Sequence, residues 1–284
     1  MKKALLTPLI LSTALTGPVI AQETPASTAQ PANSPVNARF EFGNRQYKGQ
    51  FSLRYWYGNN SIDQWLKSKD SSSGIDIFNN TKLSLGMLNV NTDYWFGIVT
   101  PEGLGFLGTV FGLGLSVDYM DQLVQDVRLM TYMMDFQFAK VSLWHDQDWK
   151  NNIVLSGHYI SYFNMIYNNL PPLPFQAAPY FGAGIGLEGK HPISELGEIS
   201  YKLVYVPNSR TPNPLPDGMG LLSEINTRWF LNPNLAFNLG YRFNFFRSSG
   251  DGSATSASTG SEVKLTRTLE DMFHGVNIGF TNYF

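Results

Sequence analysis

Hydrophobic and polar residues alternate along most of the chain after residue 45. In the clearest case, residues 235–247, one face carries Leu235, Phe237, Leu239, Tyr241, Phe243 and Phe245, and the other carries Asn238, Gly240, Arg242 and Asn244. Successive side chains of a strand point to opposite sides, so this pattern predicts a strand with one apolar face. The pattern recurs near 46–57, 81–99, 104–118, 127–143, 152–164, 179–188, 197–206, 219–231 and 271–284.

Repeated strands with one apolar and one polar face are the pattern of a transmembrane β-barrel. We therefore expect an all-β, antiparallel up-and-down barrel of about ten strands.

Two places interrupt the alternation. The apolar face switches between Met87 and Tyr94, and Val141 and Leu143 leave the register set by Phe138. Each interruption requires a β-bulge or an extra turn, and turns at both would raise the count to about twelve.

A bundle of transmembrane helices is excluded by the lengths of the apolar runs. The longest uncharged run, residues 103–117, is shorter than the ~20 residues that a spanning helix needs. It also contains five glycines, which destabilise a helix.

Composition agrees with a barrel that faces lipid outside and polar groups inside. The chain has 20 Phe, 14 Tyr and 6 Trp, and only 15% of its residues are charged. It has no cysteine, which excludes disulfides and thiolate metal sites, and we expect no cofactor. A net charge of -2 gives no reason to expect a nucleic-acid partner.

The N-terminal residues indicate secretion. Lys2 and Lys3 precede an apolar stretch that ends at Ala21, which is the pattern of a cleaved signal peptide over 1–21. Residues 22–45 are rich in Pro, Ser, Thr and Ala and predict a disordered periplasmic segment. The barrel is then expected over residues 46–284.

The last strand ends on Phe284, with Val276, Ile278 and Phe280 at alternate positions before it. This resembles the closing strand and C-terminal signal of bacterial outer-membrane β-barrels, although Asn282 stands where that signal has an apolar residue. The resemblance implies an outer-membrane location, contact with its lipid, and recognition by the barrel-assembly machinery through this strand. It also implies a periplasmic C-terminus, with long surface loops at 58–80, 165–178, 207–218 and 248–270 and short periplasmic turns at 100–103 and 232–234.

Charges at the inward positions are nearly balanced in sign. They are Lys48, Arg54, Asp135, Glu188, Glu198, Lys202, Glu224, Arg228 and Arg242. In a narrow porin-like channel they would set the selectivity for small solutes or ions, and we expect that function first. In a lumen of this width they could instead pair with one another and close it, giving a non-conducting structural or surface-interaction barrel.

Ser156 and His158 lie two residues apart and share one face of a predicted strand. Lipid A deacylases and outer-membrane phospholipases use Ser and His on barrel strands, so an acyl hydrolase is a third hypothesis. No acidic or amide partner for His158 is assignable from the sequence. The sequence His145-Asp146-Gln147-Asp148 resembles the Asp and His pairs of omptin proteases, but the predicted topology places it in a periplasmic turn rather than at the surface.

Overall fold

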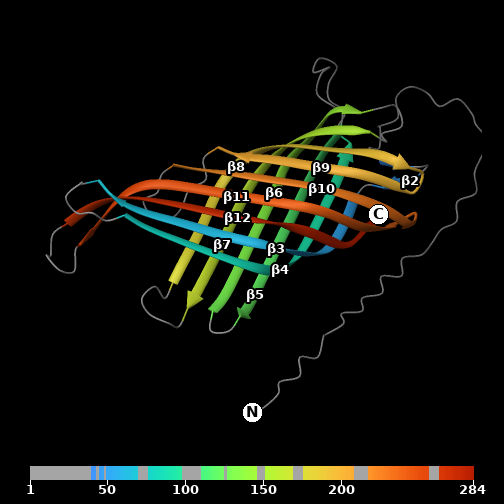
Figure 1. Cartoon of the computed structure of the whole chain (residues 1–284). Coiled ribbons are helices and arrows are strands. Elements are labelled where there is room, and N and C mark those ends of the chain that lie inside the picture. The colour runs from blue at the N-terminus through green and yellow to red at the C-terminus, as the bar shows by residue number, and fades with distance from the viewer. Residues whose placement is uncertain are drawn as a thin grey trace, which may run out of the picture. The chain divides into compact units, whose positions relative to one another are not determined.

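The computed structural model describes residues 40–42, 45–47, 49–69, 76–97, 110–124, 127–145, 151–168, 175–207, 217–255 and 262–284. Ten of its strands form a closed antiparallel barrel (Figure 1), which confirms the predicted fold class and the lower strand count. They are β3 (Gly49–Ser68), β4 (Asp76–Gly97), β5 (Val110–Val124), β6 (Val127–His145), β7 (Asn152–Asn168), β8 (Phe175–Ser194), β9 (Gly197–Val206), β10 (Asp217–Asn232), β11 (Leu235–Thr255) and β12 (Glu262–Tyr283).

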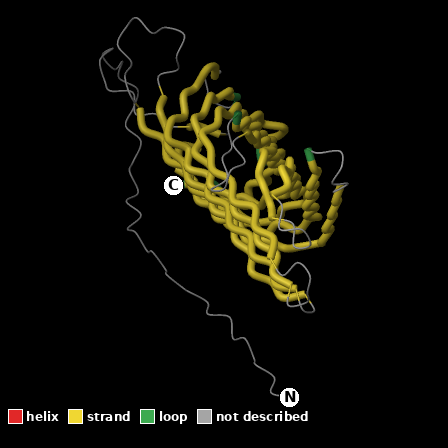
Figure 2. The backbone as a smooth tube through the Cα atoms, turned by 90° about the vertical axis from the view of Figure 1, so that its left-hand side faces the viewer, coloured by secondary structure: helices red, strands yellow, loops and turns green. Residues whose placement is uncertain are grey.

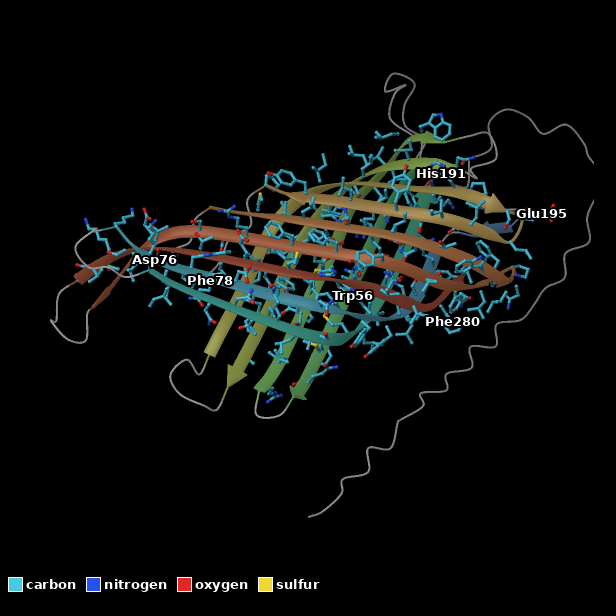
Figure 3. All side chains as sticks on the ribbon, in the orientation of Figure 1. Trp56, Asp76, Phe78, His191, Glu195 and Phe280 are labelled. Carbon is cyan, nitrogen blue, oxygen red and sulfur yellow. The ribbon has the colours of Figure 1, made fainter. Side chains whose placement is uncertain are left out.

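Each strand pairs with the next along the chain, and β12 pairs with β3 to close the ring. The Gly49 amide donates to the Phe284 carbonyl at 2.9 Å, and the Phe284 amide donates to the Gly49 carbonyl at 3.1 Å. The barrel therefore begins and finishes at one end, called here the terminal end, and the opposite end is called the loop end. In Figure 3, Glu195 marks the terminal end and Asp76 the loop end.

Strands make up the regular structure of the described chain (Figure 2). No helix in the described ranges is long and apolar enough to cross a membrane. Before the barrel, β1 (Phe40–Phe42) pairs with β2 (Arg45–Tyr47). These residues form a short hairpin where the sequence predicted the last part of a disordered segment and the first residues of the barrel. The rest of the predicted signal peptide and periplasmic segment lies outside the described residues.

The predicted alternation decides which side chains lie on the outer face of the barrel and which face the interior. On β3, Phe51 and Leu53 are 45% and 48% exposed on the outer face. Ser52 and Arg54, between and beyond them, are buried inside the barrel. The outward apolar side chains form the belt that a bilayer requires.

Of the two predicted interruptions, the one in β6 is caused by bulges, as predicted, and the one in β4 is absent. β6 runs through residues 138–143 with two register shifts, so bulges rather than a turn absorb the irregularity. β4 runs through residues 87–94 with no shift against β3 or β5, and the prediction of a bulge or turn there was wrong. Met87 points into the barrel, where the interior around it is apolar. Its apolar side chain is therefore on the inner face, and β4 keeps the same face inward throughout.

Two of the predicted surface loops, 58–80 and 248–270, are mostly strand. β3 continues to Ser68 and β4 begins at Asp76, while β11 and β12 pair as far as Thr255↔Glu262. Together with β3 and β4, these strand ends form a four-stranded extension at the loop end, called here the projecting sheet (Figure 1). The alternation did not predict this extension, because a strand with polar residues on both faces lacks the period-two pattern.

Candidate functional site

The interior of the barrel consists of two layers. Along β7, from the terminal end to the loop end, Ser156 and His158 are followed by Ile160 and Tyr162, all buried. Neighbouring strands have the same order, so a polar layer lies nearer the terminal end and an apolar layer nearer the loop end.

One half of the polar layer is built around two arginines. Arg242 donates two hydrogen bonds to the Asp118 carboxylate, at 2.7 and 2.9 Å, and its Nε lies 3.2 Å from Glu224. Arg54 pairs with the same Glu224 and donates to Asn89 at 2.9 Å. Paired, hydrogen-bonded charges are the form in which ions are tolerated in a low-dielectric interior.

The other half is built around two lysines. Lys140 lies between Asp93 and Glu188, at 2.8 and 2.9 Å, and is only 2% exposed. Lys202 donates to Asp135 at 2.5 Å. Each lysine therefore has a carboxylate partner, and the two halves of the polar layer leave few charges available to a solute.

Nearest the terminal end, Arg228 donates to Glu198 at 2.7 Å, and the Tyr283 hydroxyl donates to the same carboxylate at 3.3 Å.

Each inward charge predicted from the sequence lies inside the barrel, apart from Lys48, which is outside the described residues. The sequence reasoning missed Asp93, Asp118 and Lys140. Asp93 was missed because a switch of faces was expected in β4. Lys140 was missed because the bulge before it in β6 shifts the alternation by one residue.

Ser156, His158 and Asp135 have the connectivity of a catalytic triad. His158 Nε2 lies 2.8 Å from Ser156 Oγ, and Nδ1 lies 2.7 Å from Asp135 Oδ1. Asp135 is thus the acidic partner that sequence reasoning did not find. The Ser156 hydroxyl has one hydrogen and lies within reach of two groups that can accept it, His158 Nε2 and Glu188 Oε1 at 3.0 Å. Ser156 and His158 are at most 1% exposed, and together they complete the network between Lys140 and Lys202.

Two inward glycines make room for this network rather than for a channel. A β-carbon on Gly186 would lie 2.4 Å from His158 Nε2 and 2.6 Å from Ser156 Oγ. One on Gly114 would lie 2.3 Å from Asp93 Oδ1. The space that these glycines leave is occupied by the polar side chains opposite.

The apolar layer crosses the barrel above the charges. Phe246 stacks between Tyr162 and Tyr180, with ring centroids 4.6 and 5.2 Å away. Trp56 meets Phe273 edge to face at 4.2 Å (Trp56 is labelled in Figure 3). These five side chains are at most 2% exposed and join one cluster with inward Met, Leu, Ile and Val residues.

A small polar group is embedded in the apolar layer. Asp271 accepts hydrogen bonds from Asn60 at 3.0 Å and from Asn164 at 2.9 Å, and Thr131 donates to Asn164 at 3.1 Å. These bonds join β3 and β12 on one side of the interior to β6 and β7 on the other. They satisfy the buried polar atoms and tie the two sides together.

A cavity of about 120 Å³ lies in the polar layer. Its lining extends from Gly49 and Tyr283 at the terminal end to Asn244 and to Leu222, a residue of the apolar layer. In the described part of the chain, no group of three His, Asp or Glu residues could hold a metal ion.

No family model and no curated protein sequence matches this chain. Among solved structures, it is similar to the outer membrane protease OmpT from Escherichia coli, with a TM-score of 0.53, 10% identity, and coverage of 91% of this chain and 100% of that one. The outer membrane protein OprG from Pseudomonas aeruginosa gives a TM-score of 0.33 at 13% identity, covering 86% of this chain and 99% of OprG. The chain therefore has the same fold as the bacterial outer-membrane β-barrel of OmpT.

The likeness to OmpT concerns the fold alone. His145, from the segment that resembles omptin pairs, is the last residue of β6 and lies at the terminal end, as predicted. Residues 146–150 lie outside the described ranges.

Proposed function

We propose that the protein is a non-conducting barrel that acts through surfaces at its loop end. The observation that carries this proposal is the apolar layer, in which Trp56, Phe246 and Phe273 are each at most 2% exposed inside the barrel. A hydrated ion or small polar solute would have to displace packed aromatic rings from this layer, and protein interiors of this kind are packed as densely as crystals.

The polar layer supports the same conclusion. A selective pore presents charges to a passing solute, but here Arg242 and Lys140 each contact two carboxylates. The charges that would have set selectivity in a channel instead bind one another. An acyl hydrolase is not supported, because Ser156 and His158 are at most 1% exposed and a lipid substrate would have no access to the hydroxyl.

Two contacts expected from the sequence remain part of the proposal. The outer belt would contact outer-membrane lipid, and the strand ending on Phe284 would be recognised by the barrel-assembly machinery. With both barrel termini at the periplasmic side, the projecting sheet would stand at the cell surface.

Liposome swelling tests whether the barrel is closed. We expect liposomes containing the refolded wild-type protein to be no more permeable to small sugars than protein-free liposomes. The variant Trp56→Ala/Phe246→Ala removes two of the rings that fill the apolar layer and should admit the same sugars. Rapid swelling of wild-type liposomes would contradict the proposal.

A further inference from the structure

One edge of the projecting sheet has no strand beside it among the described residues. The ladder between β4 and β5 begins at Gly97↔Val110 and stops at Leu88↔Tyr119. Both strands continue beyond that point, β4 paired with β3 and β5 paired with β6. Residues 76–87 are therefore the border of the projecting sheet (Figure 1; Asp76 and Phe78 are labelled in Figure 3), called here the free edge of β4.

The direction of the backbone groups on this edge follows from one hydrogen bond. The Gln122 side-chain amide of β5 donates to the Gly86 carbonyl at 3.2 Å, so this carbonyl points away from β3. Backbone groups alternate in direction with a period of two. The amides and carbonyls of Ser84, Lys82, Asn80 and Phe78 therefore also point to the free edge.

The packing of aromatic rings supports this assignment. Phe78 lies opposite Trp65 of β3, and their rings stack with centroids 5.1 Å apart. In an antiparallel pair, side chains come closest where the two residues do not exchange backbone hydrogen bonds. The backbone groups of Phe78 are thus not used by β3 and face the free edge.

Natural sheets protect their edges with prolines, bulges, short strands or several charges. The free edge of β4 has no proline and no register shift against β3, and its charged residues are Asp76 and Lys82. Ile77 and Phe78 are 51% and 56% exposed on its two faces. A long, straight, partly apolar edge of this kind is a template for an additional strand.

We propose that the free edge of β4 binds an extended segment of a partner polypeptide as an additional strand, with an acidic side chain beside Lys82 and an apolar one against Phe78. The proposal rests on the proposed function, since it names the loop-end surface through which a closed barrel acts. A second copy of the same edge fits poorly. Two-fold pairing about the middle of the edge would bring two Lys82 side chains together, and opposed like charges destabilise a sheet.

A peptide copied from β3 is a suitable probe. Residues 60–68, NSIDQWLKS, already pair with the other edge of β4, with Trp65 opposite Phe78 and Ser61 opposite Lys82. We expect the fluorescein-labelled peptide to bind the refolded protein saturably, measured by fluorescence anisotropy in lipid nanodiscs. A peptide with Ser61→Glu should bind about two- to fivefold more tightly at low salt, and Lys82→Glu in the protein should remove that advantage.

The edge itself is tested by Ser84→Pro in the protein. This change removes an amide that points to the free edge and leaves the hydrogen bonds to β3 in place. We expect peptide affinity to fall about tenfold. The matched control is Ser84→Ala, which removes the hydroxyl that donates to Asn59 at 2.9 Å but keeps the backbone amide, and it should bind as the wild type does.

Folding of each variant is checked by its shift in gel mobility on heating. Absence of saturable binding to the wild-type protein, or equal affinity of Ser84→Pro and Ser84→Ala, would overturn the proposal. An advantage of the Ser61→Glu peptide that survives Lys82→Glu would overturn the acidic partner chemistry. If wild-type liposomes are impermeable but no peptide binds, only the proposed strand binding at β4 is refuted. If wild-type liposomes are permeable, the closed barrel is refuted, and the peptide measurement still decides whether β4 binds a strand.

Discussion

Lys140 shows how a single residue holds the polar layer together. Its ammonium group contacts the carboxylates of Asp93 and Glu188 and has almost no exposure to solvent. Removing one partner from a buried ion pair leaves the other charges uncompensated, which costs more than the net contribution of the intact pair. The same holds for Arg242, between Asp118 and Glu224.

We expect Lys140→Met to destabilise the barrel by about 3–5 kcal/mol, because it removes the cation between the buried carboxylate of Asp93 and the partly buried carboxylate of Glu188. The measurement is the urea midpoint of unfolding in lipid vesicles, followed by tryptophan fluorescence. Lys67→Met, at an exposed position of the projecting sheet, is the matched control and should leave the midpoint unchanged. Equal midpoints for the two variants would show that the Lys140 network does not stabilise the fold.

At the scale of the strand, outward glycines are covered by aromatic rings from the neighbouring strand. Gly189 of β8 lies opposite Tyr201 of β9, and a β-carbon there would be 2.3 Å from the tyrosine ring. Such rings shield the backbone that glycine exposes and help fix the register of the two strands.

Gly189→Ala should therefore displace the Tyr201 ring and destabilise the barrel by about 1–3 kcal/mol. Gly252→Ala is the control, since nothing lies within 4 Å of its added carbon. The measurement is the urea midpoint of unfolding of each variant, which should be lower for Gly189→Ala than for Gly252→Ala. A Gly189→Ala midpoint equal to that of Gly252→Ala would show that the ring moves without cost.

The alternation of side chains made the strands of the barrel predictable, because an apolar outer face and a polar interior impose a period of two. The period of two is lost where the surroundings of a strand change or where a bulge shifts its residues. Met87 points into an apolar layer, so its inward position resembled a change of face, and the bulges of β6 moved Lys140 out of the expected register. The Asp135–His158 contact joins residues 23 apart in sequence on neighbouring strands, and only the register of β6 against β7 brings them together.

For the whole molecule, the two interior layers divide the barrel into an occupied polar half and a packed apolar half. The polar half contains a cavity of about 120 Å³, enough for a few ordered waters. The aromatic rings of the apolar layer and the cross-barrel bonds of Asp271 lie between that cavity and the loop end. Closure of the lumen and the proposed binding at the projecting sheet concern different parts of the fold, so each has its own test.

The most direct test of closure is single-channel current recording across a planar bilayer that contains the refolded wild-type protein. Folding is verified beforehand by the mobility shift on heating. We predict a flat current at all moderate voltages, since no hydrated ion can pass the rings of Trp56, Phe246 and Phe273. Discrete, reproducible current steps from the folded wild-type barrel would contradict the account.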